Sequence, residues 1–130
     1  MTEGYSGTPQ LKKLGIKPGI RLLLVGKDAD WEFAEPLEDV GIVPPGPTDV
    51  ALVFVRAAAE LDLATWGQWI FPTGSVWVAW PRKAAGHVSD VDENAIRNAA
   101  LELGLVDVKV AAIDTDWSGL KIVWRKENRG

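Results

Sequence analysis

The chain contains no cysteine and only one histidine, His87. Without cysteine it cannot form disulfide bonds, thiolate metal sites or a cysteine nucleophile. A zinc site normally needs three or four good ligands, and one histidine with carboxylates does not supply that set. His87 is the only imidazole available as a general base, and no nucleophile is identifiable beside it. We therefore expect no metal, no cofactor and no catalytic residue.

An excess of basic charge and a long apolar run are also missing. Lysine and arginine total 14 against 18 aspartates and glutamates, which gives a net charge of −4. This balance opposes general nucleic-acid binding, so a basic strip of Lys12, Lys13 and Lys17 with Arg125, Lys126 and Arg129 is interpreted as a solvated face. No run of 18 apolar residues and no N-terminal signal pattern occur, and we expect a cytoplasmic protein without membrane contact.

A glycine-rich loop is the third absence. Residues 21–26, Arg-Leu-Leu-Leu-Val-Gly, are typical of the first strand of a dinucleotide- or S-adenosylmethionine-binding fold. The following residues, Lys27 to Trp31, contain no further glycine, whereas a Rossmann phosphate loop needs glycines for its tight turn and for close approach to the ligand. The sequence therefore indicates the fold and argues against its usual function.

Apolar patterning divides the chain into three parts: an N-terminal segment with a short helix (1–19), a single α/β domain (20–126) and a solvated tail (127–130). The short helix is expected to have Thr8 as N-cap and Pro9 as its first residue, and to end before Gly15. Apolar or alternating runs predict strands at 20–25, 49–56, 75–80, 106–113 and 120–125. Helical spacing predicts helices at 30–40, 57–71 and from Asp90 to Leu103, with 41–48 as a loop.

Strands that alternate with helices predict a mainly parallel sheet, and the short turn predicted at 114–119 requires the last pair to be antiparallel. The expected fold class is thus a three-layer α/β domain with about five strands. Its mainly parallel sheet ends in an antiparallel hairpin, as in a truncated class I methyltransferase-like (Rossmann-like) domain.

Ligands of open α/β sheets bind beyond the carboxyl ends of the parallel strands. Residues expected at that edge form the candidate ligand-binding set: Arg56, Arg82, Lys83, Asp114, Asp116, Trp117 and Ser118. The three cations could hold a phosphate or carboxylate. The alternative, which we favour, is that they pair with Asp28, Asp30, Asp114 and Asp116 and orient loops.

Two further features at this edge have alternative interpretations. Trp117 could stack on a ring of a ligand, but in a chain with seven tryptophans it more often plugs the end of a sheet. The helix start near Ser89 to Val91 offers free amides to an anion.

Four blocks carry a resemblance to a known family: residues 5–9, 13–19, 77–83 and 114–120. Together they resemble the small bacterial proteins of domain-of-unknown-function family 3052, over nearly the whole chain. The resemblance implies the Rossmann-like fold and brings no activity, ligand or site residue with it. Separately, residues 71–78 are similar to the proline–glycine turn before a late methyltransferase strand, which is an analogy of fold alone.

Three functions remain open. The first is a non-catalytic domain that binds an anionic small molecule. The second is a structural or partner-binding protein, for example a homodimer. In this case the apolar loop 41–47 is expected to form an exposed patch. The third is an S-adenosylmethionine-dependent methyltransferase, which the missing glycines disfavour. We expect the first.

Overall fold

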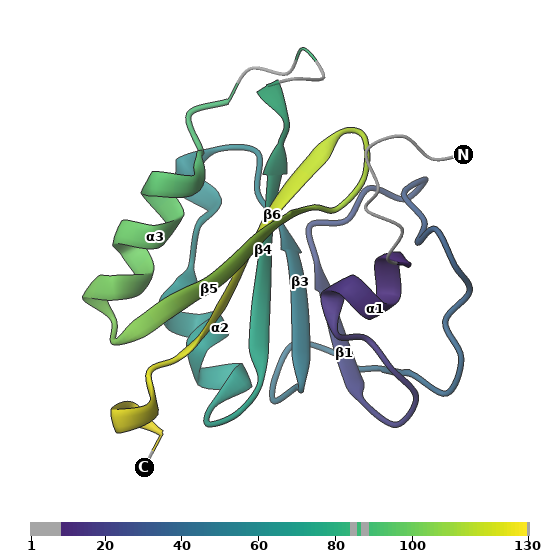
Figure 1. Cartoon of the computed structure of the whole chain (residues 1–130), viewed down its shortest axis with the longest axis horizontal. Coiled ribbons are helices and arrows are strands. Elements are labelled where there is room, and N and C mark those ends of the chain that lie inside the picture. Colours follow the sequence, from purple (N-terminus) through teal and green to yellow (C-terminus); the bar gives the residue numbers. More distant parts are fainter. Residues whose placement is uncertain (1–8, 84–85, 87–88, 130) are drawn as a thin grey trace.

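The computed structural model describes residues 9–83, 86 and 89–129, and within them one six-stranded sheet has packing layers on both faces (Figure 1). The strand order is β2-β1-β3-β4-β6-β5. The strands are β1 (Arg21–Val25), β2 (Gly41–Ile42), β3 (Val50–Phe54), β4 (Ser75–Pro81), β5 (Leu105–Ala112) and β6 (Trp117–Trp124). The helices are α1 (Gln10–Leu14), α2 (Leu63–Ile70) and α3 (Glu93–Glu102).

The first four strands are parallel, and β6 runs antiparallel to both of its neighbours, β4 and β5. This arrangement confirms the mainly parallel α/β sheet that ends in an antiparallel hairpin. The sheet has one strand more than expected, because β2 lies inside the segment 41–48 that was predicted to be loop. Within the described residues, no helix has the length and apolar character that spanning a membrane requires.

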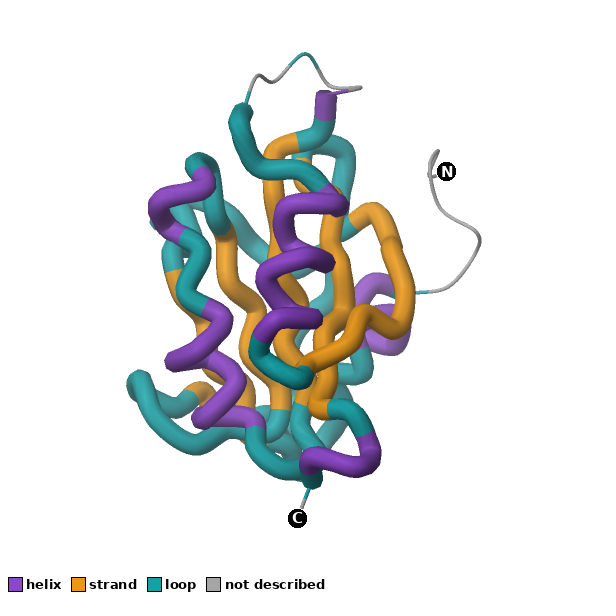
Figure 2. The backbone as a smooth tube through the Cα atoms, turned by 90° about the vertical axis from the view of Figure 1, so that its left-hand side faces the viewer, coloured by secondary structure: helices purple, strands orange, loops and turns teal. Residues whose placement is uncertain are grey.

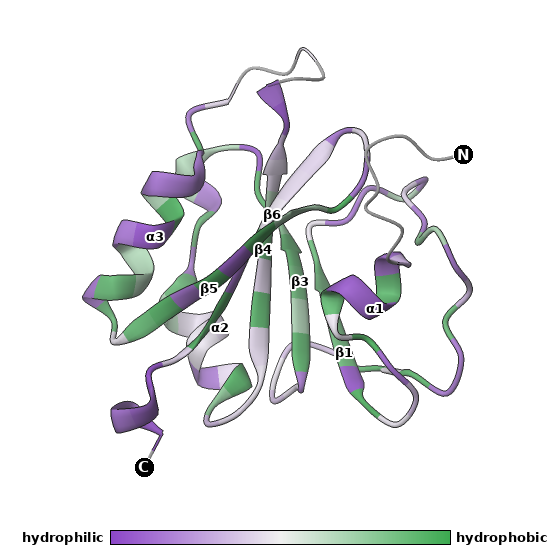
Figure 3. Ribbon diagram, in the orientation of Figure 1, coloured by the Kyte–Doolittle hydropathy of each residue, from purple (hydrophilic) through white to green (hydrophobic). Residues whose placement is uncertain are grey.

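The central strands form because their apolar runs are buried on both faces. All five residues of β3 are buried, and so are the first six of β4. Figure 3 shows the contrast with the outer strand β5, where purple segments interrupt the green. Continuous burial of this kind is typical of parallel strands covered on both sides.

One face of the sheet is covered by α2 and α3 (Figures 1 and 2), which bury Trp66, Ile70, Ile96 and Ala100 against it. The predicted helix 57–71 was too long, because the side chain of Asp62 caps α2 through the amide of Thr65 and so fixes its start.

The predicted cap of α3 was also wrong. Asp92, not Asp90, accepts the amide of Ala95, at 2.9 Å. The carboxylate of Asp90 instead accepts the amide of Ala58 at 2.8 Å, where the chain forms a 3-10 turn, Ala58–Glu60. Asp90 therefore links two connections at this end of the sheet.

The opposite face is covered by α1 and by the segment 27–40 (Figure 1). Gly15 ends α1 with φ of 77°, as expected. Pro9 occupies the N-cap position, and the proposed cap Thr8 lies outside the described residues. The helix predicted at 30–40 is wrong: the segment has no helical turn, although Trp31, Phe33 and Leu37 still pack on the core.

Gln10 ties this second layer together. Its side chain is almost fully buried, its Nε2 donates to the carbonyl of Ile113 at 2.8 Å, and its Oε1 accepts the amide of Ala34 at 2.7 Å. Glu35 accepts the amides of Gln10 and Leu11 at the start of α1. A buried polar side chain with all of these bonds made fixes the position of α1 relative to both the loop and the sheet.

The C-terminal residues follow β6 closely rather than leaving the domain. Residues Lys126–Asn128 form a 3-10 turn, and Asn128 Nδ2 donates to the carbonyl of Gly104 at 2.9 Å. Arg129 Nε donates to the carbonyl of Trp124 at 3.0 Å. The described part of the tail is mostly exposed, yet it is bonded back onto the fold.

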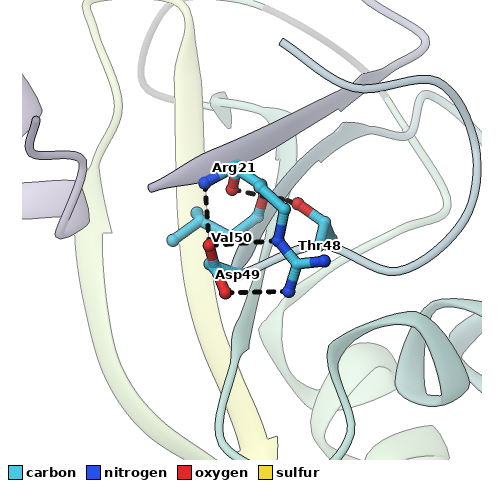
Figure 4. Close-up of polar contacts among 4 residues, drawn as sticks. All are labelled: Arg21, Thr48, Asp49 and Val50. Carbon is cyan, nitrogen blue, oxygen red and sulfur yellow. Dashed lines mark hydrogen bonds and ion pairs between the residues drawn. The ribbon is translucent and has the colours of Figure 1, made fainter. Parts of the chain in front are cut away.

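A polar cluster joins the starts of β1 and β3 (Figure 4). Asp49 Oδ2 accepts the amide of Arg21 at 2.8 Å, and its Oδ1 lies 3.1 Å from the Arg21 guanidinium. The Thr48 hydroxyl lies 3.0 Å from the carbonyl oxygens of both Arg21 and Val50. The hydrogen bonds from Arg21 hold the pKa of the Asp49 carboxyl below its ordinary value of 3.8.

We expect Asp49→Asn to lower stability modestly at neutral pH, because both partners are half exposed and solvent screens the pair. A carboxyl whose folded-state pKa is depressed stabilises the fold fully above its unfolded pKa, and this contribution is lost as pH falls through the folded value. Urea unfolding midpoints of the variant and the parent should therefore differ at neutral pH and converge in acid. Asp30→Asn, which removes another exposed carboxylate, is the control, and a difference that persists in acid would contradict the expectation.

Candidate functional site

The carboxyl ends of β1, β3 and β4 lie at one edge of the sheet, and the turn between β5 and β6 joins them there. Pro81 at the end of β4 is paired with Trp117, and the amide of Arg82 donates to the carbonyl of Asp116 at 2.9 Å. The turn is shorter than predicted, because β6 already begins at Trp117. The residues expected at this edge are therefore close in space, but most of their polar atoms already bond to the chain itself.

Gly26 ends β1 with φ of 72°, and a Cβ at this position would lie 2.6 Å from the carbonyl oxygen of Phe54. Glycine is thus required here by the neighbouring strand β3. After it, Lys27 Nζ donates to the carbonyls of Asp28 and Trp31, both at 2.8 Å, and holds the turn closed. The one glycine present where a Rossmann fold has its phosphate loop therefore has a structural reason to be glycine.

Arg56 follows β3 and fixes the loop after β1. Its Nη1 donates to the carbonyl of Gly26 at 3.0 Å, and its Nη2 pairs with Asp28 Oδ1 at 2.6 Å. The guanidinium also lies over the ring of Trp117, 5.0 Å from the centroid, as in a cation–π contact. The interpretation that this cation orients a loop agrees with these bonds.

A row of aromatic rings fills the edge beneath Arg56. Phe33, Trp31, Phe54 and Trp117 follow one another at centroid distances of 4.9, 5.0 and 4.9 Å, each pair edge to face. Trp117 is only 8% exposed, so its ring is a plug at the end of the sheet and not a stacking platform.

Arg82 and Asp114 organise the turn between β5 and β6. Arg82 Nη1 lies 3.3 Å from the carbonyl of Asp114 and 3.4 Å from that of Thr115. The carboxylate of Asp114 accepts the amides of Asp116 and Trp117 and, at 2.8 Å, the indole N–H of Trp31. Contrary to expectation, Arg82 meets backbone carbonyls rather than an aspartate side chain in these bonds.

The remaining two ligand-binding candidates are Lys83 and Ser118. Lys83 is exposed just beyond β4, and Ser118 lies inside β6, where it is paired with Trp80 on one side and Ala112 on the other. The Ser89 hydroxyl bonds to the carbonyl of Arg56 and the amide of Val91, so part of the expected anion site before α3 is already occupied by the chain. His87 lies outside the described residues.

A hollow lies beside β1, along the segment that was predicted to be a helix. It is an open pocket of about 540 Å³ with a mainly apolar lining. Its walls come from β1, β2 and the connection between them: Leu24, Lys27, Trp31, Glu32, Phe33, Ala34, Glu35, Pro36, Leu37 and Ile42. Sequence reasoning missed it, although Pro36 was a signal that the segment would not form a continuous helix.

The ionisable groups of this pocket are Lys27, Glu32 and Glu35. Lys27 is bonded to two carbonyls and Glu35 to two amides of α1, so both charges have partners within the fold. Among the residues that the structure describes, no group of three or more histidine, aspartate or glutamate side chains is placed to hold a metal ion. The pocket is chemically suited to hold an apolar body with one polar group.

Comparison with known proteins bears on the fold. No protein-family model and no curated protein sequence matches the chain, so the resemblance to the family of unknown function stays a prediction. A solved structure, a SAM-dependent methyltransferase from Aquifex aeolicus, is similar with a TM-score of 0.57. The match has 13% sequence identity and covers 86% of each chain. It confirms the methyltransferase-like fold class, and at this identity it concerns the fold alone.

Proposed function

We propose that this chain is a non-catalytic binding domain that takes up a small molecule in the pocket beside β1. The observation that carries the proposal is the pocket itself. Its volume of about 540 Å³ falls within the usual range for small-molecule sites, and its lining is mainly apolar with aromatic side chains. The candidate cations Arg56 and Arg82, by contrast, bond to the chain's own carbonyls and to Asp28.

The lining favours a compact apolar ligand with one anionic group. Trp31, Phe33 and Leu37 supply apolar surface. An ammonium group has three N–H donors, and Lys27 uses two of them on carbonyls, which leaves one for an oxygen of the ligand. Two carboxylates also belong to the lining. Glu35 already accepts two amides of α1, and Glu32 is exposed, so solvent screens its charge.

The dye 1-anilinonaphthalene-8-sulfonate has apolar rings and one anionic group, and isothermal titration calorimetry with it tests the proposal. We expect saturable binding at one site. Ile42→Trp should weaken binding about tenfold or more, because a larger ring at the exposed rim fills the pocket. Phe71→Trp, which enlarges an exposed side chain that is not part of the lining, is the matched control. Equal binding by both variants, or no saturation, would overturn the assignment.

The same titration with S-adenosylmethionine addresses the function named for the similar structure. The aromatic row and the single glycine after β1 are the reasons to expect no binding. Saturable binding of S-adenosylmethionine would overturn the proposal of a non-catalytic domain and favour methyltransferase activity instead.

Partner binding is the second candidate, and exposed apolar side chains favour it. Ile42 in the segment 41–47 is 54% exposed, and Val108 and Val110 on the outer strand β5 are about half exposed. The two sets lie at opposite edges of the sheet, on β2 and on β5. Light scattering after size-exclusion chromatography would show a dimer if either edge pairs with a second copy. Strictly monomeric behaviour at high concentration would count against it.

A further inference from the structure

Two lysines face each other in the β5–β6 hairpin, directly beside a tryptophan. Lys109 is paired with Lys121 across the two strands, and Lys121 is paired with Trp77 on β4. Directly paired residues point to the same face of a sheet, so the three side chains form one row. The ammonium of Lys109 lies 5.8 Å from the centroid of the Trp77 ring, which places the row on the face that α1 covers.

A third lysine joins this row from α1. Lys13 Nζ donates to the carbonyl of Ala112, three residues beyond Lys109 on β5, at 2.8 Å. Burial and then repulsion from Lys109 lower the pKa of Lys13, with Glu35 acting in the opposite direction, and the same two causes lower the pKa of Lys121. Lys13, Lys109 and Lys121, called the lysine cluster below, therefore share one electrostatic environment.

This arrangement is unfavourable for the fold alone. Like charges directly opposite each other destabilise an antiparallel pair. Within the described part of the chain, no ion pair joins Lys109 or Lys121 to a carboxylate, although the protein carries 18 acidic residues. A local conflict of this kind, here between Lys109 and Lys121, is expected at functional sites more than elsewhere in a fold.

We propose that the lysine cluster binds the polyphosphate group of a small molecule. Lysine is a compact point charge with rotatable donors, which suits phosphate oxygens, and three lysines match an anion with several charges. Trp77 is fully buried, so its ring is not available for stacking on a base. Recognition at this site therefore depends on the anion and not on the organic part that carries it. None of the three lysines belongs to the lining of the pocket beside β1.

Calorimetric titration with inorganic pyrophosphate and tripolyphosphate tests the proposal. We expect saturable binding that is tighter for tripolyphosphate and weakens as salt is added. Lys109→Gln and Lys121→Gln should each reduce affinity about tenfold, because each removes a hydrogen bond to a charged group. Lys12→Gln and Lys17→Gln, which remove exposed lysines outside the cluster, should bind as the parent does. Binding that is absent at about 10 mM, or equal in all four variants, would overturn the proposal.

The melting temperature of the ligand-free protein is a second measurement, and it distinguishes a binding lysine from one that stabilises the fold. Lys121→Gln should raise the melting temperature of the ligand-free protein, because the variant loses the repulsion from Lys109. Tripolyphosphate should then raise the melting temperature of the parent more than that of the variant. A lower melting temperature for ligand-free Lys121→Gln would show a structural role and overturn the proposal. If a single-stranded oligonucleotide binds more tightly than tripolyphosphate does, the ligand of this site is nucleic acid and the proposal of a small anion is overturned.

Discussion

Trp77→Ala should lower the free energy of unfolding by about 3–5 kcal/mol, the range for truncating a buried tryptophan. The Trp77 side chain is fully buried in the middle of β4, and its indole N–H donates to the carbonyl of Leu14 at 2.9 Å. The truncation would leave a cavity between the sheet and α1 and would free the last carbonyl of that helix. Since the total free energy of unfolding of a small domain is about 5–15 kcal/mol, the variant should unfold at a much lower denaturant concentration.

Trp77→Phe separates the two contributions to this effect. The phenylalanine ring keeps much of the apolar contact but has no N–H, so the Leu14 carbonyl loses its partner at a cost of about 1–3 kcal/mol. Urea unfolding followed by circular dichroism measures both variants. If Trp77→Ala costs less than Trp77→Phe, Trp77 is not the central packing residue of this layer.

Gly26→Ala should have the second large effect and lower the free energy of unfolding by about 2–4 kcal/mol. Alanine disfavours the left-handed backbone at this position, and its Cβ would also clash with a neighbouring atom. With φ of 72° and a Cβ position 2.6 Å from the Phe54 carbonyl oxygen, alanine forces β1 away from β3. The displacement would also break the bond from Arg56 to the Gly26 carbonyl.

Gly15 offers the matched control for this substitution. Its φ is 77°, almost the same as that of Gly26, but a Cβ there would meet nothing within 4 Å. Gly15→Ala should therefore show only the conformational cost, about 1 kcal/mol. Similar losses in both variants, measured by denaturant unfolding, would contradict a clash at Gly26.

The strands were predictable because burial on both faces leaves a simple signature. The runs that became β3 and β4 are short and almost wholly apolar, as is typical of parallel strands covered on both faces. The segment 30–40 misled the prediction for a related reason. Its apolar residues suggested a helix, since Trp31 and Ala34 are three apart and Phe33 and Leu37 are four apart. Trp31, Phe33 and Leu37 instead reach the core from an irregular backbone that contains Pro36.

The position of the candidate edge was predictable from topology, whereas the contacts between the side chains at this edge were not. The sequence could place Arg56 and Trp117 after their strands, but not show that one lies over the other. Gln10 had no visible role, because its bond to Ile113 joins residues at opposite ends of the chain. The lysine cluster likewise depends on strand register, which puts Lys109 opposite Lys121 only once the bulge between Asp107 and Lys109 is known.

The place of β6 between β4 and β5 has a consequence for synthesis of the chain on the ribosome. Val76 in β4 pairs with Ile122 in β6, so one side of β4 has no partner until more than 40 further residues have been made. During that time β4 and β5 both present unpaired backbone, the kind of edge that promotes aggregation. β6 thus completes the interior of the sheet after its two neighbours have been made, and a chain that stops before Trp117 lacks both ladders that β6 forms, one with β4 and one with β5.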